Sequence, residues 1–152
     1  MSVAAPKKIV FNSRFDHGVD DKRRLQIPSK WRTDEEGFEF MVILWPKHQL
    51  GPCLRVMPMV EYHKLAETIE SLPLNDPKRD PMSRIVFGNA ETVALDKTGR
   101  ICLPERMAKE AGIKRDVVLV GMNSRFEIWD AERHKALHAS DDAHRPAVFA
   151  SL

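Results

Sequence analysis

The segment V-D-D-K-R-R-L-Q-I-P at residues 19–28 returns as L-D-K-T-G-R-I-C-L-P at residues 95–104, a shift of 76 positions. Both segments have an Asp, an Arg four residues later and a Pro four residues after that, and the positions between them keep their apolar character. The same shift places Ile9-Val10-Phe11 on Ile85-Val86-Phe87 without a gap. We therefore interpret residues 8–28 and 84–104 as two copies of one supersecondary unit.

A second repeat follows each copy at a slightly different spacing. The segment Leu54-Arg55-Val56-Met57 matches Phe126-Glu127-Ile128-Trp129 at a shift of 72, so the loops within the two copies differ by four residues. The chain of 152 residues is long enough to bury one sizeable core, whereas either half alone would be marginal. We predict two tandem half-domains with a shared core, at residues 8–72 and 84–139, joined by a linker at 73–83 and followed by an extended or mobile tail at 140–152.

Local patterns predict strands and helices within each half. Apolar residues alternate with polar ones over residues 11–19, which is the period of a half-buried strand, and residues 91–95 repeat that pattern. Each strand leads through a charged tip into a short alternating strand that a proline ends, so each copy is expected to be a hairpin. Buried strands are predicted at 40–44, 54–57, 117–120 and 126–129, and helices at 28–32, 62–72, 104–111 and from Asp130 to about His138. These elements predict an α+β fold.

Composition and motifs exclude several classes of protein. The 24 Lys and Arg nearly balance the 22 Asp and Glu, so local clusters of charge decide the choice of partner; basic side chains gather in the first 24 residues. Cys53 and Cys102 form no pair with metal or redox spacing, which favours a reducing cytosol. The sequence has no signal peptide, no apolar run that could span a membrane, and no phosphate loop, nucleophile elbow or zinc-protease motif. We expect neither an enzyme nor a cofactor.

One histidine pair leaves a metal-dependent enzyme open as an alternative. His134 and His138 lie four residues apart on the last predicted helix, a spacing that can hold a metal ion, and acidic residues follow them. Without a third fixed ligand, a solvated helix face is the simpler interpretation. We therefore predict no metal site.

The charged tips are the better candidates for a functional site. Asp20 precedes Arg24, and Asp96 precedes Arg100, by four residues across a predicted tight turn, so each carboxylate can fix the orientation of one guanidinium. A guanidinium fixed in this way can bind a phosphate or the O6/N7 edge of a guanine. We predict that the arginines contact DNA, that the aspartates orient them, and that the nearby basic side chains contact phosphates; these are Arg14, Lys22, Arg23 and Lys97.

These motifs resemble the paired D-x-x-x-R segments of the MraZ family of bacterial regulators. The resemblance covers residues 8–137 and includes R-I-V-F-G-N-A-E before the second motif and V-V-L-V-G-M-N-S-R-F-E-I-W-D after it. It implies a pseudo-two-fold, AbrB-like β-barrel of two interleaved swapped hairpins with flanking helices, and subunits that assemble into a ring-shaped homo-oligomer. The family pattern has Gly before the motif arginine, as Gly99 does, whereas the first motif has Arg23 at that position.

The resemblance also implies a function. It predicts a cytoplasmic, nucleoid-associated transcriptional regulator that binds short direct repeats in double-stranded DNA, in the promoter of its own operon in the division and cell-wall gene cluster. An antitoxin-like protein, which binds operator DNA and neutralises a toxin partner, is the second hypothesis.

Overall fold

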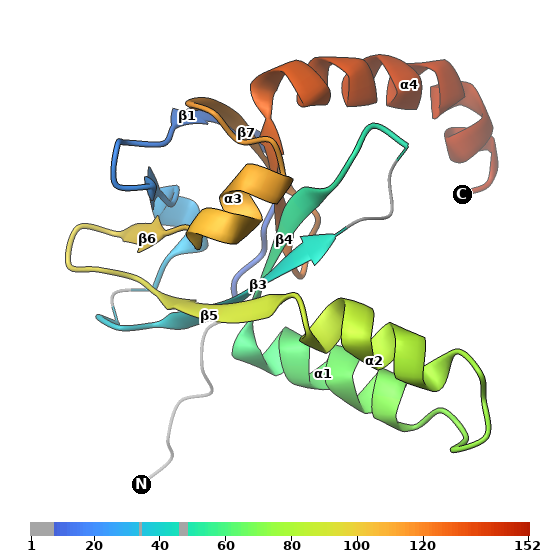
Figure 1. The fold of residues 1–152 in the computed structure, drawn as a ribbon. Helices are drawn as coiled ribbons and strands as arrows, with labels where there is room; N and C mark the ends of the chain where they lie inside the picture. Colours follow the sequence, from blue (N-terminus) through green and yellow to red (C-terminus); the bar gives the residue numbers. More distant parts are fainter. Residues whose placement is uncertain (1–7, 34, 46–48) are drawn as a thin grey trace, which may run out of the picture.

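The computed structural model describes residues 8–33, 35–45 and 49–152 (Figure 1). These residues form an α+β protein, as predicted. The strands are β1 (Arg14–Gly18), β2 (Arg24–Gln26), β3 (Glu39–Trp45), β4 (Cys53–Pro58), β5 (Ala90–Ala94), β6 (Arg100–Cys102), β7 (Asp116–Gly121) and β8 (Phe126–Asp130). The helices are α1 (Met59–Glu70), α2 (Arg79–Phe87), α3 (Glu105–Glu110) and α4 (Ala131–Ala150), together with the 3-10 helix η1 (Ser29–Trp31).

The order of the strands shows a pseudo-two-fold relation between the two copies. The larger sheet is antiparallel with the order β1-β7-β8-β4-β3-β5. The repeated strands are β1 and β5, β3 and β7, and β4 and β8, and exchanging the members of each pair gives the same order read from the other end of the sheet. At the centre of the β4–β8 pair, Arg55 lies opposite Glu127, and these two residues are equivalent positions of the two copies. In the smaller sheet of β2 and β6, Leu25 opposes its own repeat, Ile101. A pseudo-two-fold axis therefore passes through the centres of both strand pairs.

The two copies exchange strands. β1 of the first copy pairs with β7 of the second half, β5 of the second copy pairs with β3 of the first half, and β2 pairs with β6. The predicted hairpins are therefore confirmed only at their tips: within the first copy β1 and β2 meet at the bridge between Val19 and Leu25 and then pair with strands of the other half. Exchange lets the three-residue strands β2 and β6 bury Leu25 and Ile101 against both halves.

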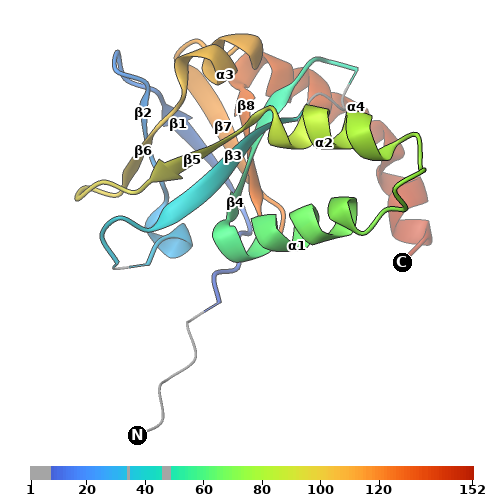
Figure 2. The ribbon, with the colours of Figure 1, turned by 60° about the horizontal axis from the view of Figure 1, so that its bottom comes forward.

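The expected closed barrel is not confirmed. The six-stranded sheet has β1 and β5 at its edges, and β2 and β6 form a separate two-stranded sheet. Figure 2 shows the two sheets together, with β2 and β6 beside β1 and β5. We refer to this outlying two-stranded sheet as the β2–β6 ribbon.

One core serves both halves. Phe11, Trp31, Phe40 and Phe126 are fully buried and form an aromatic cluster, in which the ring centroids of Trp31 and Phe126 lie 4.9 Å apart. Aliphatic side chains of β2, β6 and the residues next to them along the chain, including Val19, Ile27, Leu95 and Leu103, pack on the same cluster. Because the ribbon contributes to the core, its position relative to the large sheet is fixed by packing rather than by the charged turns.

A smaller core joins helices α1 and α2 to the large sheet. It contains Met41, Ile43, Met57, Ile69 and Val86. The helix α2 is absent from our prediction, which placed residues 73–83 in a linker and matched Ile85-Val86-Phe87 to Ile9-Val10-Phe11. Pro81 is tolerated because it lies in the first turn of the helix, where its missing N–H has no intrahelical partner.

The repeat therefore begins later than the sequence match suggests. Ile85-Val86-Phe87 is helical and buries Val86, whereas Phe11 forms an isolated bridge with Asn123. The first predicted strand, residues 11–19, is also shorter than expected, because Ser13 has a φ of 74° and interrupts it before β1. The structural repeat pairs β1 with β5 and β2 with β6 at the 76-residue shift.

The last helix is longer than predicted. Asp130 caps α4 by accepting a hydrogen bond from the backbone N–H of Arg133 at 3.3 Å, as expected, but the helix continues to Ala150. The predicted extended tail at 140–152 is therefore wrong. The helix has no buried residue, and an ion pair of Asp142 with Arg145 at 2.7 Å lies on its exposed turns.

Candidate nucleic-acid interface

The first turn (residues 20–24) is organised by one carboxylate. Asp20 Oδ1 accepts hydrogen bonds from the backbone N–H groups of Lys22 at 2.9 Å and Arg24 at 2.8 Å. Its second oxygen, Oδ2, accepts a hydrogen bond from Arg24 Nε at 2.7 Å. The same side chain therefore closes the turn and fixes the guanidinium of Arg24.

The second turn (residues 96–100) repeats this arrangement. Asp96 Oδ1 accepts hydrogen bonds from the N–H groups of Thr98 and Arg100 at 2.9 Å, and Oδ2 accepts one from Arg100 Nε at 3.1 Å. The Thr98 hydroxyl donates a further hydrogen bond to Asp96 Oδ1 at 2.9 Å. The prediction that each aspartate holds the arginine four residues later is confirmed.

These contacts keep both carboxylates ionised. The backbone N–H of Arg100 and the donors of Thr98 together lower the pKa of Asp96 to about 2, partly opposed by desolvation. The pKa of Asp20 is also lowered, chiefly by the backbone N–H of Arg24. Each turn thus presents an arginine beside a carboxylate that is ionised at neutral pH, with both side chains at least three-tenths exposed.

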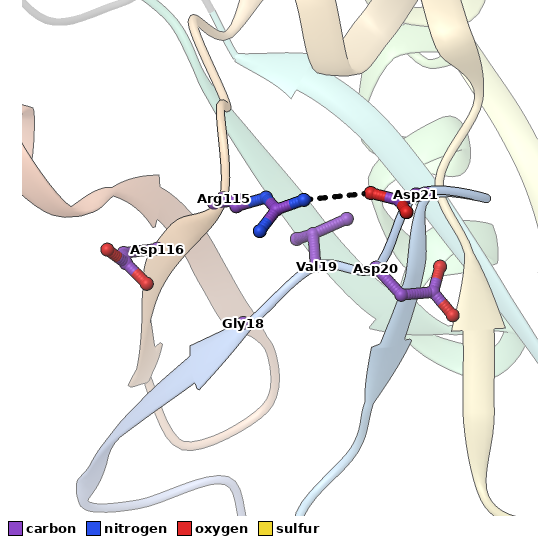
Figure 3. A pocket seen from close by; sticks show the side chains of 6 residues that line it. All are labelled: Gly18, Val19, Asp20, Asp21, Arg115 and Asp116. Atoms are coloured by element: carbon purple, nitrogen blue, oxygen red, sulfur yellow. Dashed lines mark hydrogen bonds and ion pairs between the residues drawn. The ribbon is translucent and has the colours of Figure 1, made fainter.

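A groove of about 350 Å³ lies beside the first turn (Figure 3). It is lined by Gly18, Val19, Asp20, Asp21, Arg115 and Asp116. The guanidinium of Arg115 forms an exposed ion pair with Asp21 at 2.9 Å. The register of β1 with β7 brings this cation to the turn, since the carbonyl of Arg115 accepts the N–H of Val19 at 2.8 Å.

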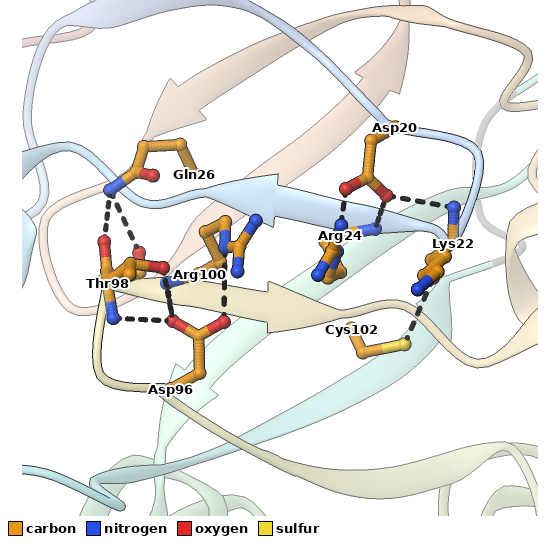
Figure 4. A network of polar contacts seen from close by, with 9 residues as sticks. Asp20, Lys22, Arg24, Gln26, Asp96, Thr98, Arg100 and Cys102 are labelled. Carbon is orange, nitrogen blue, oxygen red and sulfur yellow. Dashed lines mark hydrogen bonds and ion pairs between the residues drawn. The ribbon is translucent and has the colours of Figure 1, made fainter.

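The outer face of the β2–β6 ribbon joins the two turns (Figure 4). Because Leu25 and Ile101 oppose each other and are buried, the residues on either side of them share the outward face. That face presents Arg24, Gln26, Arg100 and Cys102. Each strand begins where its turn ends, so the two turns lie at opposite ends of the antiparallel ribbon. Arg24 and Arg100 are diagonal neighbours on its outward face, and the residues of such a pair lie roughly 7–8 Å apart in a standard antiparallel sheet.

The structure brings four of the six predicted DNA-contacting residues to this surface. Lys22 and Lys97 are exposed on the turns, beside Arg24 and Arg100. Arg23 belongs to the first turn, but its Nε donates to the carbonyl of Leu103 at 3.1 Å, so its stem is directed toward the second copy. Arg14 lies at the far end of β1, where its Nη1 is 3.0 Å from His138 Nδ1 on α4.

His134 and His138 stack on each other, with ring centroids 5.9 Å apart. Burial lowers the pKa of His134, and the charge of Arg14 lowers it further. Within residues 8–33, 35–45 and 49–152, no group of three or more His, Cys, Asp or Glu side chains could hold a metal ion. None of the helices in this part of the chain is long and apolar enough to cross a membrane.

Three residues at this surface were not predicted from the sequence to belong to the site. Gln26, Cys102 and Arg115 carry no motif, and each contacts a residue of the other half that is at least 72 positions away. The sequence relates two of them, since Gln26 and Cys102 are equivalent positions of the repeat, and it carries no signal for Arg115. Contacts between copies follow from the strand exchange, which the periodicity of the sequence does not specify.

Comparisons with known proteins agree on one family. Residues 86–148 match the family model described as "MraZ protein, putative antitoxin-like". The chain is 38% identical over 143 residues to the transcriptional regulator MraZ of Thermomicrobium roseum, covering 94% of this chain and 97% of that protein. It is 36% identical to the Clostridium tetani protein of the same name, covering 82% and 84%, and 37% identical to that of Frankia alni, covering 82% and 83%.

Proposed function

We propose that this chain, which belongs to the MraZ family, is a transcriptional regulator that binds double-stranded DNA through the outer face of the β2–β6 ribbon. One observation supports this most directly: two arginines, each fixed by its own aspartate, lie on the same exposed face and are related by a pseudo-two-fold axis. The proposal includes no catalytic step.

A two-stranded β-ribbon is one of the elements that the major groove of DNA accommodates. In that groove an arginine can donate two hydrogen bonds to the O6 and N7 atoms of guanine. The contact with aspartate engages one of the five N–H donors of each guanidinium, which leaves its terminal nitrogens for a base. Arg24 and Arg100 would therefore contact bases a few steps apart, while Asp20 and Asp96 orient them.

The other basic residues are assigned to the DNA backbone. Lys22 and Lys97 flank the two arginines, and Arg115 adds a third cation beside the first turn. Arg23 can reach a phosphate only through its terminal nitrogens, and Arg14 only if DNA extends along β1 toward α4. Salt dependence distinguishes these roles, since each phosphate contact steepens the salt dependence of affinity.

The finer expectations from the family resemblance form part of this proposal. They comprise an AbrB-like swapped-hairpin architecture, nucleoid association in the cytoplasm, a ring-shaped homo-oligomer, and operator DNA made of direct repeats ahead of the chain's own operon. Direct repeats follow from a ring, because neighbouring subunits are related head to tail and present their ribbons in the same sense. A second ribbon then binds at high effective concentration once the first is seated.

The test is a titration on DNA from immediately upstream of the gene, against a shuffled duplex, at two salt concentrations. Arg24→Ala and Arg100→Ala should each weaken specific binding by roughly 1–3 kcal/mol per engaged site, while the protein remains folded. Arg84→Ala is the matched control, because this exposed arginine lies on α2, away from the ribbon (Figure 1). If both ribbon variants bind like the parent, the assignment of the interface is wrong.

The repeat arrangement has its own test. Inserting five base pairs between adjacent repeats places the second repeat on the opposite face of the duplex, so affinity should fall toward that of one repeat. Inserting about ten base pairs, one helical turn, should restore part of it. Unchanged affinity after the five-base-pair insertion would show that the repeats are bound independently.

One feature of α4 favours the antitoxin-like alternative. The end of α4 carries exposed apolar side chains, including Val148 and Phe149, which are 55% and 65% exposed. Apolar side chains at the end of a solvated helix are typical of a surface that a protein partner covers. Under this alternative, loss of the gene is toxic while a toxin is expressed; for a regulator alone, loss changes transcription of the operon without such toxicity.

A further inference from the structure

Each turn is supported by the other copy of the repeat. The backbone N–H of Ile27 donates to the carbonyl of Gly99 at 3.0 Å, and the N–H of Leu103 donates to the carbonyl of Arg23 at 2.8 Å. These two contacts are related by the 76-residue repeat, so the backbones of the two turns are held equally. Differences between the turns must therefore come from side chains.

One side-chain contact is stronger at the second turn. Gln26 Nε2 donates to the carbonyl of Thr98 at 2.9 Å and lies 3.3 Å from that of Gly99. At the equivalent position, Cys102 Sγ lies 3.4 Å from the carbonyl of Lys22. An amide is a good hydrogen-bond donor and a thiol is a weak one, so the second turn is held more firmly from across the ribbon.

A second side chain covers the second turn. The guanidinium of Arg32 packs against Gly99, so closely that a methyl group at residue 99 would collide with it. Its Nε atom is buried. The equivalent of Arg32 in the second copy is Ala108, which has no side chain long enough to cover the first turn.

The first turn relies on its own strained residue. Arg23 has a φ of 62°, where a side chain costs energy, whereas Gly99 adopts a φ of 79° without that cost. The hydrogen bond from Arg23 Nε to the carbonyl of Leu103 offsets part of the strain. The first turn thus combines a less favourable backbone with a weaker contact from across the ribbon, and the ion pair that Arg115 of the other half forms with Asp21 is highly exposed.

From these contacts we infer that the second turn determines which bases are bound, with Gln26 and Arg32 as positioning residues for Arg100, whereas the first turn adapts to its site. This inference rests on the proposed DNA-binding function. An arginine that is already fixed loses less freedom on binding and tolerates fewer misplaced partners, so the preorganised turn discriminates more sharply between base pairs.

The experiment measures base preference at each position of a randomised operator library bound to the full chain. Arg100→Ala and Arg24→Ala first identify the positions that depend on each turn. Gln26→Ala should then reduce preference at the second-turn positions by about threefold to tenfold, the factor that one hydrogen bond contributes, and leave first-turn positions unchanged. Arg32→Ala should act on the same positions.

Variants of the equivalent residue provide matched controls. Cys102→Ala should change the preference at the first-turn positions by less than about twofold, because it removes only a weak donor. Cys102→Gln installs the amide of the second turn at the first turn and should sharpen preference there. A residue with a merely structural role would instead weaken the preferences of both turns together.

The outcomes separate this inference from the proposed function. If the parent selects an operator and both arginine variants lose it, but Gln26→Ala affects both sets of positions equally or neither, the inference is overturned and the function stands. If the parent shows no preference for any sequence, both are overturned. Selective loss with Gln26→Ala and a selective gain with Cys102→Gln would support it.

Discussion

The two turns have the same backbone hydrogen bonds and differ in the side chains that contact them from the other copy. Both use an aspartate to bind two N–H groups and one guanidinium, with matched distances that differ by at most 0.4 Å. The D-x-x-x-R motif therefore forms the same turn with different residues between the Asp and the Arg. What differs is the support from the other copy: Gln26 and Arg32 contact the second turn, whereas the weak donor Cys102 and the exposed side chain of Arg115 contact the first.

The comparison also explains the departure of the first motif from glycine. At the second turn Gly99 leaves space that Arg32 of the first copy fills. At the first turn Arg23 carries the long side chain, and the equivalent residue of the other copy is Ala108. Positions 99 and 32 therefore hold a glycine and an arginine, whereas the equivalent positions 23 and 108 hold an arginine and an alanine.

The largest effect should come from forcing the second turn to resemble the first. Gly99→Arg places a side chain at positive φ and displaces the guanidinium of Arg32, so it should lower the free energy of unfolding by about 2 kcal/mol. Combining it with Arg32→Ala recreates the arrangement at Arg23 and Ala108. The double variant should then lose at least about 0.5 kcal/mol less than the sum of the single losses, measured by urea unfolding. Strict additivity would show that positions 99 and 32 do not interact.

A pH titration compares the two carboxylates directly. Carboxyl-carbon NMR should show Asp96 titrating near 2, and Asp20 below its ordinary value. Because both pKa values are lowered in the folded protein, the stabilisation from these groups is complete above about pH 4 and is lost as the pH falls toward 2. Thr98→Val removes one donor and should raise the pKa of Asp96, whereas the same variant should leave that of Asp20 unchanged. A midpoint for Asp96 near 4 would mean that the turn is open in solution.

The smallest effect is expected from Arg23→Gly. Glycine relieves the strain at positive φ, but it also removes the hydrogen bond to Leu103 and adds freedom to the unfolded chain, so the free energy of unfolding should change by less than about 1 kcal/mol. If Arg23 only supports the turn, the slope of log affinity against log salt stays as in the parent. A slope flatter by about one unit would instead place Arg23 on a phosphate.

The repeat in the sequence predicts the features that depend on residues close together along the chain. The 76-residue shift locates β2, β6 and both turns, and the spacing of Asp20 and Arg24 predicts their ion pair, because a tight turn fixes such neighbours. The exposed end of α4 has no helical apolar periodicity, and the match of Ile85-Val86-Phe87 to Ile9-Val10-Phe11 gave no sign of the helix α2. The contact between Gln26 and Thr98 depends on strand exchange between distant segments, so no local pattern could reveal it.

The central claim, that operator DNA covers the outer face of the β2–β6 ribbon, can be tested with the unmodified chain. Cys102 is exposed on that face, directly opposite Arg24, whereas Cys53 is buried and its thiol pKa is raised by that burial. The measurement is the rate of Cys102 alkylation with saturating operator DNA, with a shuffled duplex, and without DNA. We predict that operator DNA slows the reaction severalfold and that the shuffled duplex has a smaller effect. An unchanged rate when the operator is fully bound would show that DNA lies elsewhere on the molecule.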